Sequence, residues 1–524
     1  MTTDQKVHGD RKPASDQLVI QLARLGDYCQ TVPFLQDLRA RMASCSQDKR
    51  GRLALVCDNE TANAVGLEVD DVIALPLRQL RQHSVSSESR VAERLLEIDE
   101  LLKPIRDRHW QRVFNLNINP LAGLIADMAT AEEQDGWRSG ESPTGGSVSM
   151  LANCLWSSNS QRAGNNLLLA DLYRKQIDSS GTSALPPQRH TEGTVILHTG
   201  AGAVERRLPL QFWASVARIL VTDRGVREVR LTGNLQERRT CEQIARMAGP
   251  GVVSLAGETD LPLLRKLLQD SALLVAVDTG VLHLGAIART PLLGIYPGAA
   301  WWGETAPFQE GALCVTSNRD CYPCSAESSS CHHWECFTDF KAEPVAAVAL
   351  AQLQGNQEDI VSQSVVCQQS GLKVIQQITV TGWLTGVDTV SGRSLLKLPG
   401  VTMRALLTGN RLPVEEWLHQ ESSQIEAQEL IPEALIQGIE ECVTELHRNA
   451  SPERIRSLRL SGGLTACTEW TTVIRFLQKE VLSATDNPAV TGRVEHHLYL
   501  LREVEQLCRE RLLEQRNEQS MELV

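Results

Sequence analysis

The sequence contains no apolar run long enough to cross a membrane. Its first residues, MTTDQKVHGDRKPASDQ, lack the apolar core of a secretory signal. An excess of basic residues is missing too, because the net charge is -12. That charge argues against electrostatic binding to nucleic acid or to an anionic membrane, although local basic patches stay open. The simplest prediction is a cytoplasmic protein that does not bind nucleic acid.

Paired cysteines of the secreted type are not expected, although the chain has 14 cysteines. Most of them stand singly within predicted helices and strands, as reduced core residues do in chains without an export signal. The exception is a cluster in which four thiols lie within sixteen residues: Cys321, Cys324, Cys331 and Cys336. His332 and His333 lie inside it.

Four thiols that begin with a CxxC pair are enough for a tetrahedral metal site. Zinc is the default metal and iron an alternative, since the spacing does not choose between them. Reduced or redox-labile thiols, or disulfides, are the other interpretations of this cluster. A metal here would be structural and would brace the loop.

The length allows two or three domains, and a hydrophobic content of 42% is ample for their cores. After a leader at 1–16, strands alternate with helices, which predicts an α/β domain with a parallel sheet over 17–185. The predicted strands are 18–22, 53–57, 72–75 and 112–117, and the predicted helices are 28–43, 91–102, 121–131 and 165–176. The segment 136–149 is rich in Gly and Ser and is predicted to be a loop.

A break at 178–192, with Gly181, Pro186 and Pro187, is predicted to be a linker. A second alternation follows and predicts another α/β domain over 190–360. Its predicted strands are 195–198, 228–232, 252–255, 272–276 and 291–296, and its predicted helices are 210–222, 236–248 and 261–270. Two such halves imply a cleft between them.

The pattern of residue types changes at about residue 362. Strand-like stretches at 374–383 precede two segments of helical spacing, 414–447 and 470–514. Leu498, Leu501, Leu507 and Leu512 would form one apolar stripe. We expect 362–524 to be a mainly helical extension for packing or self-association.

The segment 277–286, Val-Asp-Thr-Gly-Val-Leu-His-Leu-Gly-Ala, lies between two apolar runs. A strand, a tight turn and a short helix fit this order, which places the turn at the carboxyl end of a parallel strand, where open α/β sheets bind ligands. Thr279 and Gly280 would begin the helix and offer backbone N–H groups to a pyrophosphate. Asp278 would receive sugar hydroxyls or cap the helix, and His283 would face the same rim. DTG before a helix also occurs in proteins with other uses.

Four segments in this order resemble glycosyltransferase family 9, which includes the ADP-heptose transferases of lipopolysaccharide inner-core assembly. They are 19–27 with 31–33, 113–116, 197–202 with 206–209, and 278–284 with 294–298. The resemblance covers about residues 17 to 345. It implies a GT-B fold of two Rossmann-like domains, the first binding mainly the acceptor and the second the nucleotide-sugar.

The resemblance also implies transfer with inversion at the anomeric carbon, without a metal to hold the diphosphate. A positive side chain and helix N-termini must then offset the charge of the departing nucleotide. A base must remove the proton of the acceptor hydroxyl.

Asp27 matches the base proposed for the family, whereas an N-cap of the next helix is its alternative role. Gly26 would let the backbone bend to aim it. Arg206 stands where the family usually carries a lysine that contacts the donor phosphate. Arginine has the same charge as lysine, but its planar guanidinium reaches the phosphate differently from an ammonium group. Arg207 could substitute for it. Two arginines before a helix are otherwise a solvated surface patch.

The remaining donor contacts implied by the resemblance are Thr199, Gly200, Glu237, Asp278, Thr279, Gly280 and His283. For Glu237 the implied partner is the nucleotide ribose, and a solvated helix face is the alternative. For His283 a structural hydrogen bond is the alternative.

The sequence therefore predicts a cytoplasmic glycosyltransferase of the hexosyl- or heptosyltransferase type. We expect a nucleotide-sugar donor such as ADP-heptose and a glycan or lipid-linked acceptor such as the lipopolysaccharide core, with no cofactor required for transfer. One alternative is a protein glycosyltransferase for an autotransporter or flagellin, with an extension that recognises the polypeptide. Another is a glycosyltransferase-like binding protein disabled by the lysine-to-arginine departure. Peripheral membrane contact and homo-oligomers through the C-terminal helices stay open.

Overall fold

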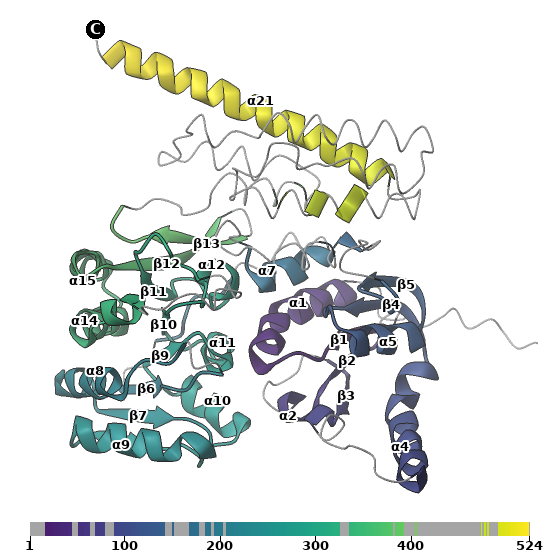
Figure 1. The fold of residues 1–524 in the computed structure, drawn as a ribbon, viewed down its shortest axis with the longest axis horizontal. Coiled ribbons are helices and arrows are strands. Elements are labelled where there is room, and N and C mark those ends of the chain that lie inside the picture. Colours follow the sequence, from purple (N-terminus) through teal and green to yellow (C-terminus); the bar gives the residue numbers. More distant parts are fainter. Residues whose placement is uncertain are drawn as a thin grey trace, which may run out of the picture.

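In the computed structural model the chain forms two α/β lobes with a helical C-terminal part above them (Figure 1). The structure describes residues 16–44, 51–62, 69–78, 88–141, 149–150, 153, 167–177, 184–189, 193–202, 206–324, 335–380, 383–391, 403, 406, 473, 476–477, 479–481 and 491–522. Side chains are described for all of these except 88–95, 380, 383 and 509–522. The predicted helix at 414–447, residues 142–148 of the predicted loop, and Cys331, His332 and His333 lie outside these residues.

The first lobe is built on a parallel sheet of order β3-β2-β1-β4-β5. Its strands are β1 (Gln17–Gln21), β2 (Leu53–Asp58), β3 (Asp71–Leu75), β4 (His109–Asn115) and β5 (Thr130–Gly136), and its helices are α1 (Leu25–Ala43), α2 (Asn59–Ala62), α4 (Glu88–Arg106) and α5 (Pro120–Met128). Strand β2 is buried almost throughout, as expected for a parallel strand covered on both faces.

Strand β5 departs from the sequence prediction, which continued the preceding helix to 131. The helix α5 ends at Met128, and Thr130–Gly136 pairs with β4 at the edge of the sheet. Its sequence, TAEEQDG, carries acidic side chains that remain largely exposed. An edge strand needs no apolar alternation, so the pattern of this segment did not indicate a strand.

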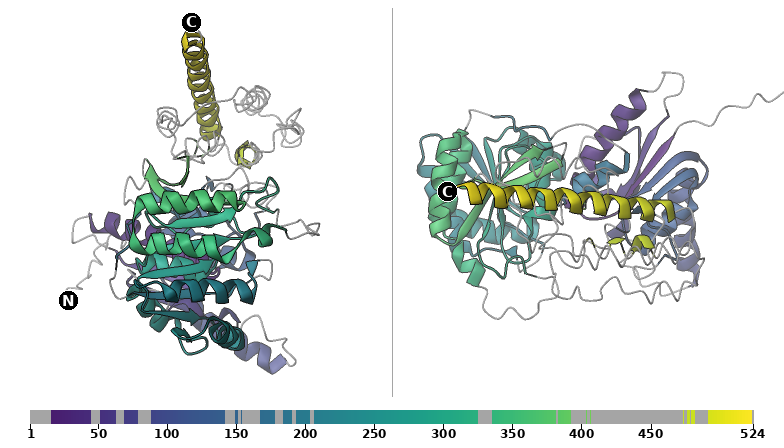
Figure 2. Two further views of the ribbon diagram at one scale, coloured as in Figure 1. Left: turned by 90° about the vertical axis from the view of Figure 1, so that its left-hand side faces the viewer. Right: turned by 90° about the horizontal axis from the view of Figure 1, so that it is seen from above.

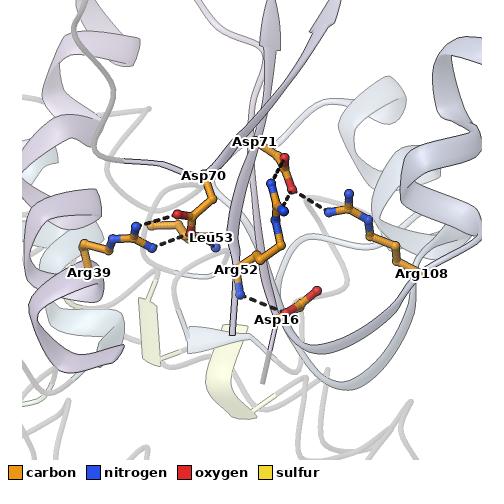
Figure 3. Close-up of polar contacts among 7 residues, drawn as sticks. All are labelled: Asp16, Arg39, Arg52, Leu53, Asp70, Asp71 and Arg108. Carbon is orange, nitrogen blue, oxygen red and sulfur yellow. Dashed lines mark hydrogen bonds and ion pairs between the residues drawn. The ribbon is translucent and has the colours of Figure 1, made fainter. Parts of the chain in front are cut away.

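Ion pairs hold the starts of the strands of the first sheet together, at the end away from the carboxyl edge (Figure 3). Asp71 accepts hydrogen bonds from Arg52 Nε at 2.9 Å and from Arg108 Nη1 at 2.7 Å. Asp70 pairs with Arg39 and accepts the Leu53 N–H at 2.9 Å. These groups satisfy one another, so we assign this end of the sheet a structural role.

The second lobe has an eight-stranded sheet of order β13-β12-β11-β10-β9-β6-β7-β8. Its strands are β6 (Thr194–His198), β7 (Glu228–Thr232), β8 (Val252–Ser254), β9 (Leu273–Val277), β10 (Leu292–Tyr296), β11 (Leu313–Ser317), β12 (Leu372–Val380) and β13 (Trp383–Asp388). Its helices are α8 (Leu210–Thr222), η4 (Leu235–Glu237), α9 (Arg238–Ala248), α10 (Leu261–Gln269), α11 (Gly280–Ile287), α12 (Trp302–Thr305), α13 (Glu335–Asp339), α14 (Ala342–Gln354) and α15 (Gln357–Gln369). The predicted α/β class with two Rossmann-like domains is confirmed.

Strands β12 and β13 join the second sheet in antiparallel fashion. This lobe therefore reaches residue 388, beyond the domain boundary at 360 that the sequence suggested. The change of composition near 362 marks the surface of α15 rather than the end of the sheet. The strand-like stretches at 374–383 were correctly predicted, but their pairing partner was not.

Helix α21 (Thr491–Glu522) runs above both lobes (Figures 1 and 2). Within the predicted apolar stripe Leu501 is buried, Leu498 is nearly so and Leu507 is half-buried. Asn153 Nδ2 donates to Glu480 Oε1 at 2.7 Å, so the extension contacts the segment that precedes α7 (Leu169–Arg174). None of the helices in the described ranges is long and apolar enough to cross a membrane.

The two lobes share one hydrophobic core. Side chains from α1, α7 and α11 belong to a single buried cluster that includes Tyr28, Tyr173 and Leu282. Figure 1 shows α1 facing α11, with α7 beside α1. The arrangement of the lobes therefore depends on these three helices.

Candidate active site between the two lobes

The N-termini of α1 and α11, one from each lobe, meet at the contact between the lobes. A Cβ added to Gly280 would lie 3.0 Å from the Gly26 nitrogen and 3.0 Å from Leu25 Cβ. A Cβ added to Gly26 would lie 3.3 Å from His283 Cδ2. Gly26 lies inside α1, so its importance is the close approach of the two backbones rather than the turn that the sequence suggested.

Two helix N-termini at one place concentrate partial positive charge and backbone donors there. Helix α11 begins at Gly280 with Thr279 as its N-cap, as the sequence predicted. The Thr279 hydroxyl is buried and has no hydrogen-bond partner among the residues that the structure describes. This place suits an anion, with the Thr279 hydroxyl as a further donor.

Asp27 lies in the first turn of α1, on the side of the first lobe that meets the second. Arg24 is the N-cap of this helix, so the alternative role of Asp27 as the cap does not apply. Burial raises the pKa of the Asp27 carboxyl above its ordinary value, and the nearby Glu304 of α12 acts in the same direction. The backbone and charge of Arg24 act against this rise. A half-buried carboxylate with a raised pKa is suited to accept a proton.

The two neighbouring arginines have different partners. Arg206 Nη1 donates to Asp278 Oδ2 at 2.9 Å, which holds its guanidinium beside the start of α11. Arg207 donates from Nε and Nη2 to the carbonyl oxygen of Ala201, at 3.0 and 2.9 Å. Arg206 is thus the one directed at the candidate anion site, whereas Arg207 binds the backbone of Ala201.

Asp278 is buried at the end of β9 and pairs with Arg206. It therefore orients the arginine, a role that the sequence did not suggest. The helix cap is Thr279, so capping by Asp278 does not apply.

Glu237 follows the carboxyl end of β7 and lies near the end of β6. Its Oε2 accepts the Asn234 N–H at 2.8 Å, and Asn234 Oδ1 accepts the Glu237 N–H at 3.1 Å, which is a capping box. The carboxylate also packs against Gly200, because a Cβ there would lie 2.0 Å from Oε1. Glu237 is therefore not on a solvated helix face. Its contact with a ribose stays a prediction, as does the contact of Thr199 and Gly200 with the diphosphate.

His283 is buried at the contact between the lobes. Its Nδ1 has no hydrogen-bond partner among the described residues. Burial lowers the pKa of His283 to about 4. The imidazole is therefore neutral at physiological pH and can offer only one N–H to a ligand.

This lowered pKa gives a measurable pH dependence of stability. The unfolded chain binds a proton at an ordinary histidine pKa of about 6.5, whereas the folded protein does not until about pH 4. Above pH 6.5 the protonation of His283 therefore does not affect the free energy of unfolding. As the pH falls to 4, the unfolded chain takes up the proton first, which lowers the free energy of unfolding by about 3 kcal/mol. We expect His283→Asn to reduce the pH dependence of the unfolding free energy by this amount, measured by chemical denaturation at pH 7 and pH 4. Equal pH dependence in both proteins would contradict the buried neutral state.

The model of glycosyltransferase family 9 (heptosyltransferase) matches residues 171–335. The predicted enzyme class, a glycosyltransferase, is thereby confirmed at the level of the family. The matched segment holds Arg206, Asp278 and His283, whereas Asp27 precedes it. No curated protein matches the chain in a sequence search.

Solved structures of glycosyltransferases resemble the chain at low identity. The family 9 glycosyltransferase of Veillonella parvula DSM 2008 is 17% identical with a TM-score of 0.44, over 58% of this chain and 86% of that one. E. coli ADP-heptose LPS heptosyltransferase II is 17% identical with a TM-score of 0.45, over 65% and 99%. The iron-containing dodecameric glycosyltransferase TibC of enterotoxigenic E. coli H10407 is 11% identical with a TM-score of 0.35, over 66% and 77%. All three TM-scores are below 0.5, so the resemblance to family 9 rests on the sequence match of residues 171–335.

The described start of the cysteine cluster lies against the segment that follows β10. The Cys324 N–H donates to the Gly298 carbonyl at 3.2 Å, just after β10. At the other end of the loop Arg319 binds Asp339 of α13 through Nε and Nη2, at 2.6 and 2.8 Å. Among the described residues, which include Cys321, Cys324 and Cys336 but not Cys331, no group of three potential ligands could hold a metal. The metal site remains a prediction.

His198 and Glu304 of the matched segment were not among the predicted site residues. His198, at the end of β6, shares a hydrogen bond of 3.1 Å with Thr232 Oγ1, and burial lowers its pKa. The charge of Glu304, in the second lobe, raises the pKa of Asp27. His198 could have been found from its place after a buried strand, whereas Glu304 carries no local signal.

Proposed function

We propose that this protein is an inverting glycosyltransferase that transfers a heptosyl group from a nucleoside diphosphate sugar such as ADP-heptose to a glycan acceptor of the lipopolysaccharide-core type. One observation carries the proposal. The first turn of α1, with Asp27, lies against the first turn of α11, beside the Arg206–Asp278 pair. In the proposal the Asp27 carboxylate of one lobe acts opposite an anion site of the other.

In the proposed reaction the acceptor hydroxyl oxygen attacks the anomeric carbon, and Asp27 takes its proton. The new carbon–oxygen bond forms as the bond from that carbon to the diphosphate oxygen breaks. The nucleoside diphosphate leaves with the electron pair of the broken bond. Arg206 and the first N–H groups of α11 stabilise the charge that gathers on it.

His283 is proposed to orient the donor as a neutral hydrogen-bonding group. Its burial leaves it uncharged, so the positive charge at the site comes from Arg206 and from the helix termini. The family model that matches residues 171–335 is described as heptosyltransferase, which supports the heptose of the donor. The adenine rests on the resemblance of the sequence to the ADP-heptose transferases.

The test is a transfer assay with the full chain. ADP-heptose, UDP-glucose and GDP-mannose are each offered with a heptose-deficient core oligosaccharide, and released nucleotide and product are followed by chromatography and mass spectrometry. The proposal expects product only with ADP-heptose, and an anomeric configuration opposite to that of the donor by NMR. Retained configuration would contradict the mechanism, and transfer only from another nucleotide-sugar would contradict the donor.

A second arm of the assay replaces the oligosaccharide with unglycosylated autotransporter or flagellin polypeptide. Transfer to polypeptide and not to oligosaccharide would overturn the proposed acceptor while leaving the chemistry in place. Donor binding without turnover on any acceptor would instead favour a binding protein.

A further inference from the structure

A buried ionic cluster lies at the junction of the two lobes and shares no residue with the candidate anion site. Arg174, at the end of α7, donates from Nε to Asp37 Oδ2 of α1 at 2.7 Å and from Nη1 to Asp171 Oδ1 at 3.2 Å. The side chains of Arg174, Asp171 and Asp37 are only 2%, 0% and 4% exposed. Three charged groups have thus been removed from water together.

The same cluster reaches the second lobe by two contacts. Asp171 Oδ2 accepts the backbone N–H of Leu384, in β13, at 2.9 Å. The Arg174 guanidinium lies 4.9 Å from the centre of the Phe308 ring, which belongs to the segment between α12 and β11. A continuous set of polar contacts therefore runs from α1 through α7 to the far edge of the second sheet.

Apolar contacts alone would hold the lobes together but would let them slide, because hydrophobic attraction has no direction. A buried ion pair is directional, and removal of one partner leaves an uncompensated charge. Arginine suits this position because its planar guanidinium can bind two carboxylates and stack on a ring at once. The cluster is thus built to specify one arrangement of the lobes.

We propose that Arg174 is a positioning residue, which fixes the two lobes at the angle that holds Asp27 against the start of α11. Asp37 and Asp27 lie on the same helix, so a constraint on Asp37 acts on the whole of α1. The link to catalysis rests on the proposed function, whereas the link to lobe geometry does not.

The test compares Arg174→Met with Arg41→Met as the matched control. Arg41 also lies on α1 and donates to the carbonyl of Ile177, at the end of the η2 turn (Lys175–Ile177) that follows α7. Its contact stays on the side of the first lobe. Both variants remove one guanidinium that joins α1 to the α7 region, and Arg174→Met also removes the contacts with Phe308 and with the Asp171 that binds β13.

The first readout is the distance distribution between the lobes, measured by pulsed dipolar spectroscopy. Spin labels are placed at Lys103 and Arg239 through a non-canonical amino acid, because the 14 cysteines preclude thiol labelling. We expect Arg174→Met to broaden or shift the distribution, and Arg41→Met to leave it unchanged. An unchanged distribution in Arg174→Met would overturn the proposal, whether or not the protein transfers sugar.

The second readout separates positioning from donor binding. We expect Arg174→Met to lower kcat by about 100-fold, while the affinity for ADP, measured by calorimetry, stays unchanged. Arg174→Lys should have a higher kcat than Arg174→Met, since lysine keeps the positive charge but lacks the planar guanidinium that binds both carboxylates. A wild-type chain without turnover would refute the proposed function and leave the distance measurement valid.

Should Arg174→Met not fold, Phe308→Leu replaces it. This variant removes the ring under the guanidinium and leaves both carboxylate contacts in place. It should broaden the same distribution to a smaller extent. If the variant that folds has the same distance distribution as the wild type, the inference is overturned.

Discussion

Replacing Asp27 with asparagine is expected to lower kcat for sugar transfer by about 10²–10⁴-fold, the usual contribution of a general base. Asparagine keeps the shape of the side chain but cannot take the proton of the acceptor hydroxyl. Binding of ADP should not change, because the residues proposed to contact the donor lie in the second lobe. Initial rates and calorimetry with ADP measure the two effects separately.

The pH profile of kcat checks the same assignment. Burial raises the pKa of Asp27, so the fraction of carboxylate falls at a higher pH than it would for an exposed aspartate. We expect wild-type kcat to decline as the pH falls through this raised pKa. The Asp27→Asn variant should show no such decline in its residual activity. His283, whose pKa is about 4, should add no step near pH 6.5.

Asp58→Asn is the matched control, because Asp58 also lies at the carboxyl edge of the first sheet, at the end of β2. There it accepts the backbone N–H of Glu60 at 3.1 Å. Its replacement should leave kcat near the wild-type value. Turnover of Asp27→Asn at the wild-type rate would remove Asp27 from the mechanism.

Arg206→Met is expected to lower kcat by about 10²–10³-fold, as the loss of one group that stabilises a developing anion does. The side chain is 30% exposed beside the start of α11 and is oriented by the buried Asp278. Methionine has a similar reach but offers neither charge nor donors. Arg206→Lys should retain much of the activity, since an ammonium supplies the same charge. Steady-state rates of nucleotide release measure the effect.

The neighbouring Arg207→Met provides the comparison. Arg207 binds the Ala201 carbonyl, so its loss should loosen the loop after β6 and raise KM more than it lowers kcat. A larger loss of kcat in Arg207→Met than in Arg206→Met would mean that Arg207, and not Arg206, stabilises the leaving group. The two variants carry the same change of charge at adjacent positions, so bulk electrostatics cannot explain a difference between them.

Much of the second lobe could be predicted from the sequence. The helix α8 and the strand β7 have the bounds that the pattern of apolar residues indicated, 210–222 and 228–232. Thr279 and Gly280 were placed at the start of a helix after a buried strand, and the structure confirms this. In these segments hydrogen bonds and apolar spacing are local, so the sequence carries their signal.

Strands at the edges of the sheets were less accessible to prediction. The acidic strand β5 has little apolar alternation, and the antiparallel pairing of β12 depends on β11, more than fifty residues earlier in the chain. The cysteine cluster could be recognised from spacing, but its ligands depend on how the loop folds. An edge position and a distant partner leave little trace in a short window of sequence.

For the candidate site, the sequence by itself determined which residues stand after which strand, and so brought Asp27, Arg206 and the DTG segment into consideration. Only the tertiary structure decided their partners. Arg206 lies 72 residues from Asp278, and Arg207 turns instead to Ala201. Gly26 and Gly280 meet because two lobes pack through one core. The physical reason is range: backbone conformation follows from neighbours along the chain, whereas charge pairing and close packing depend on residues that only the folded chain brings together.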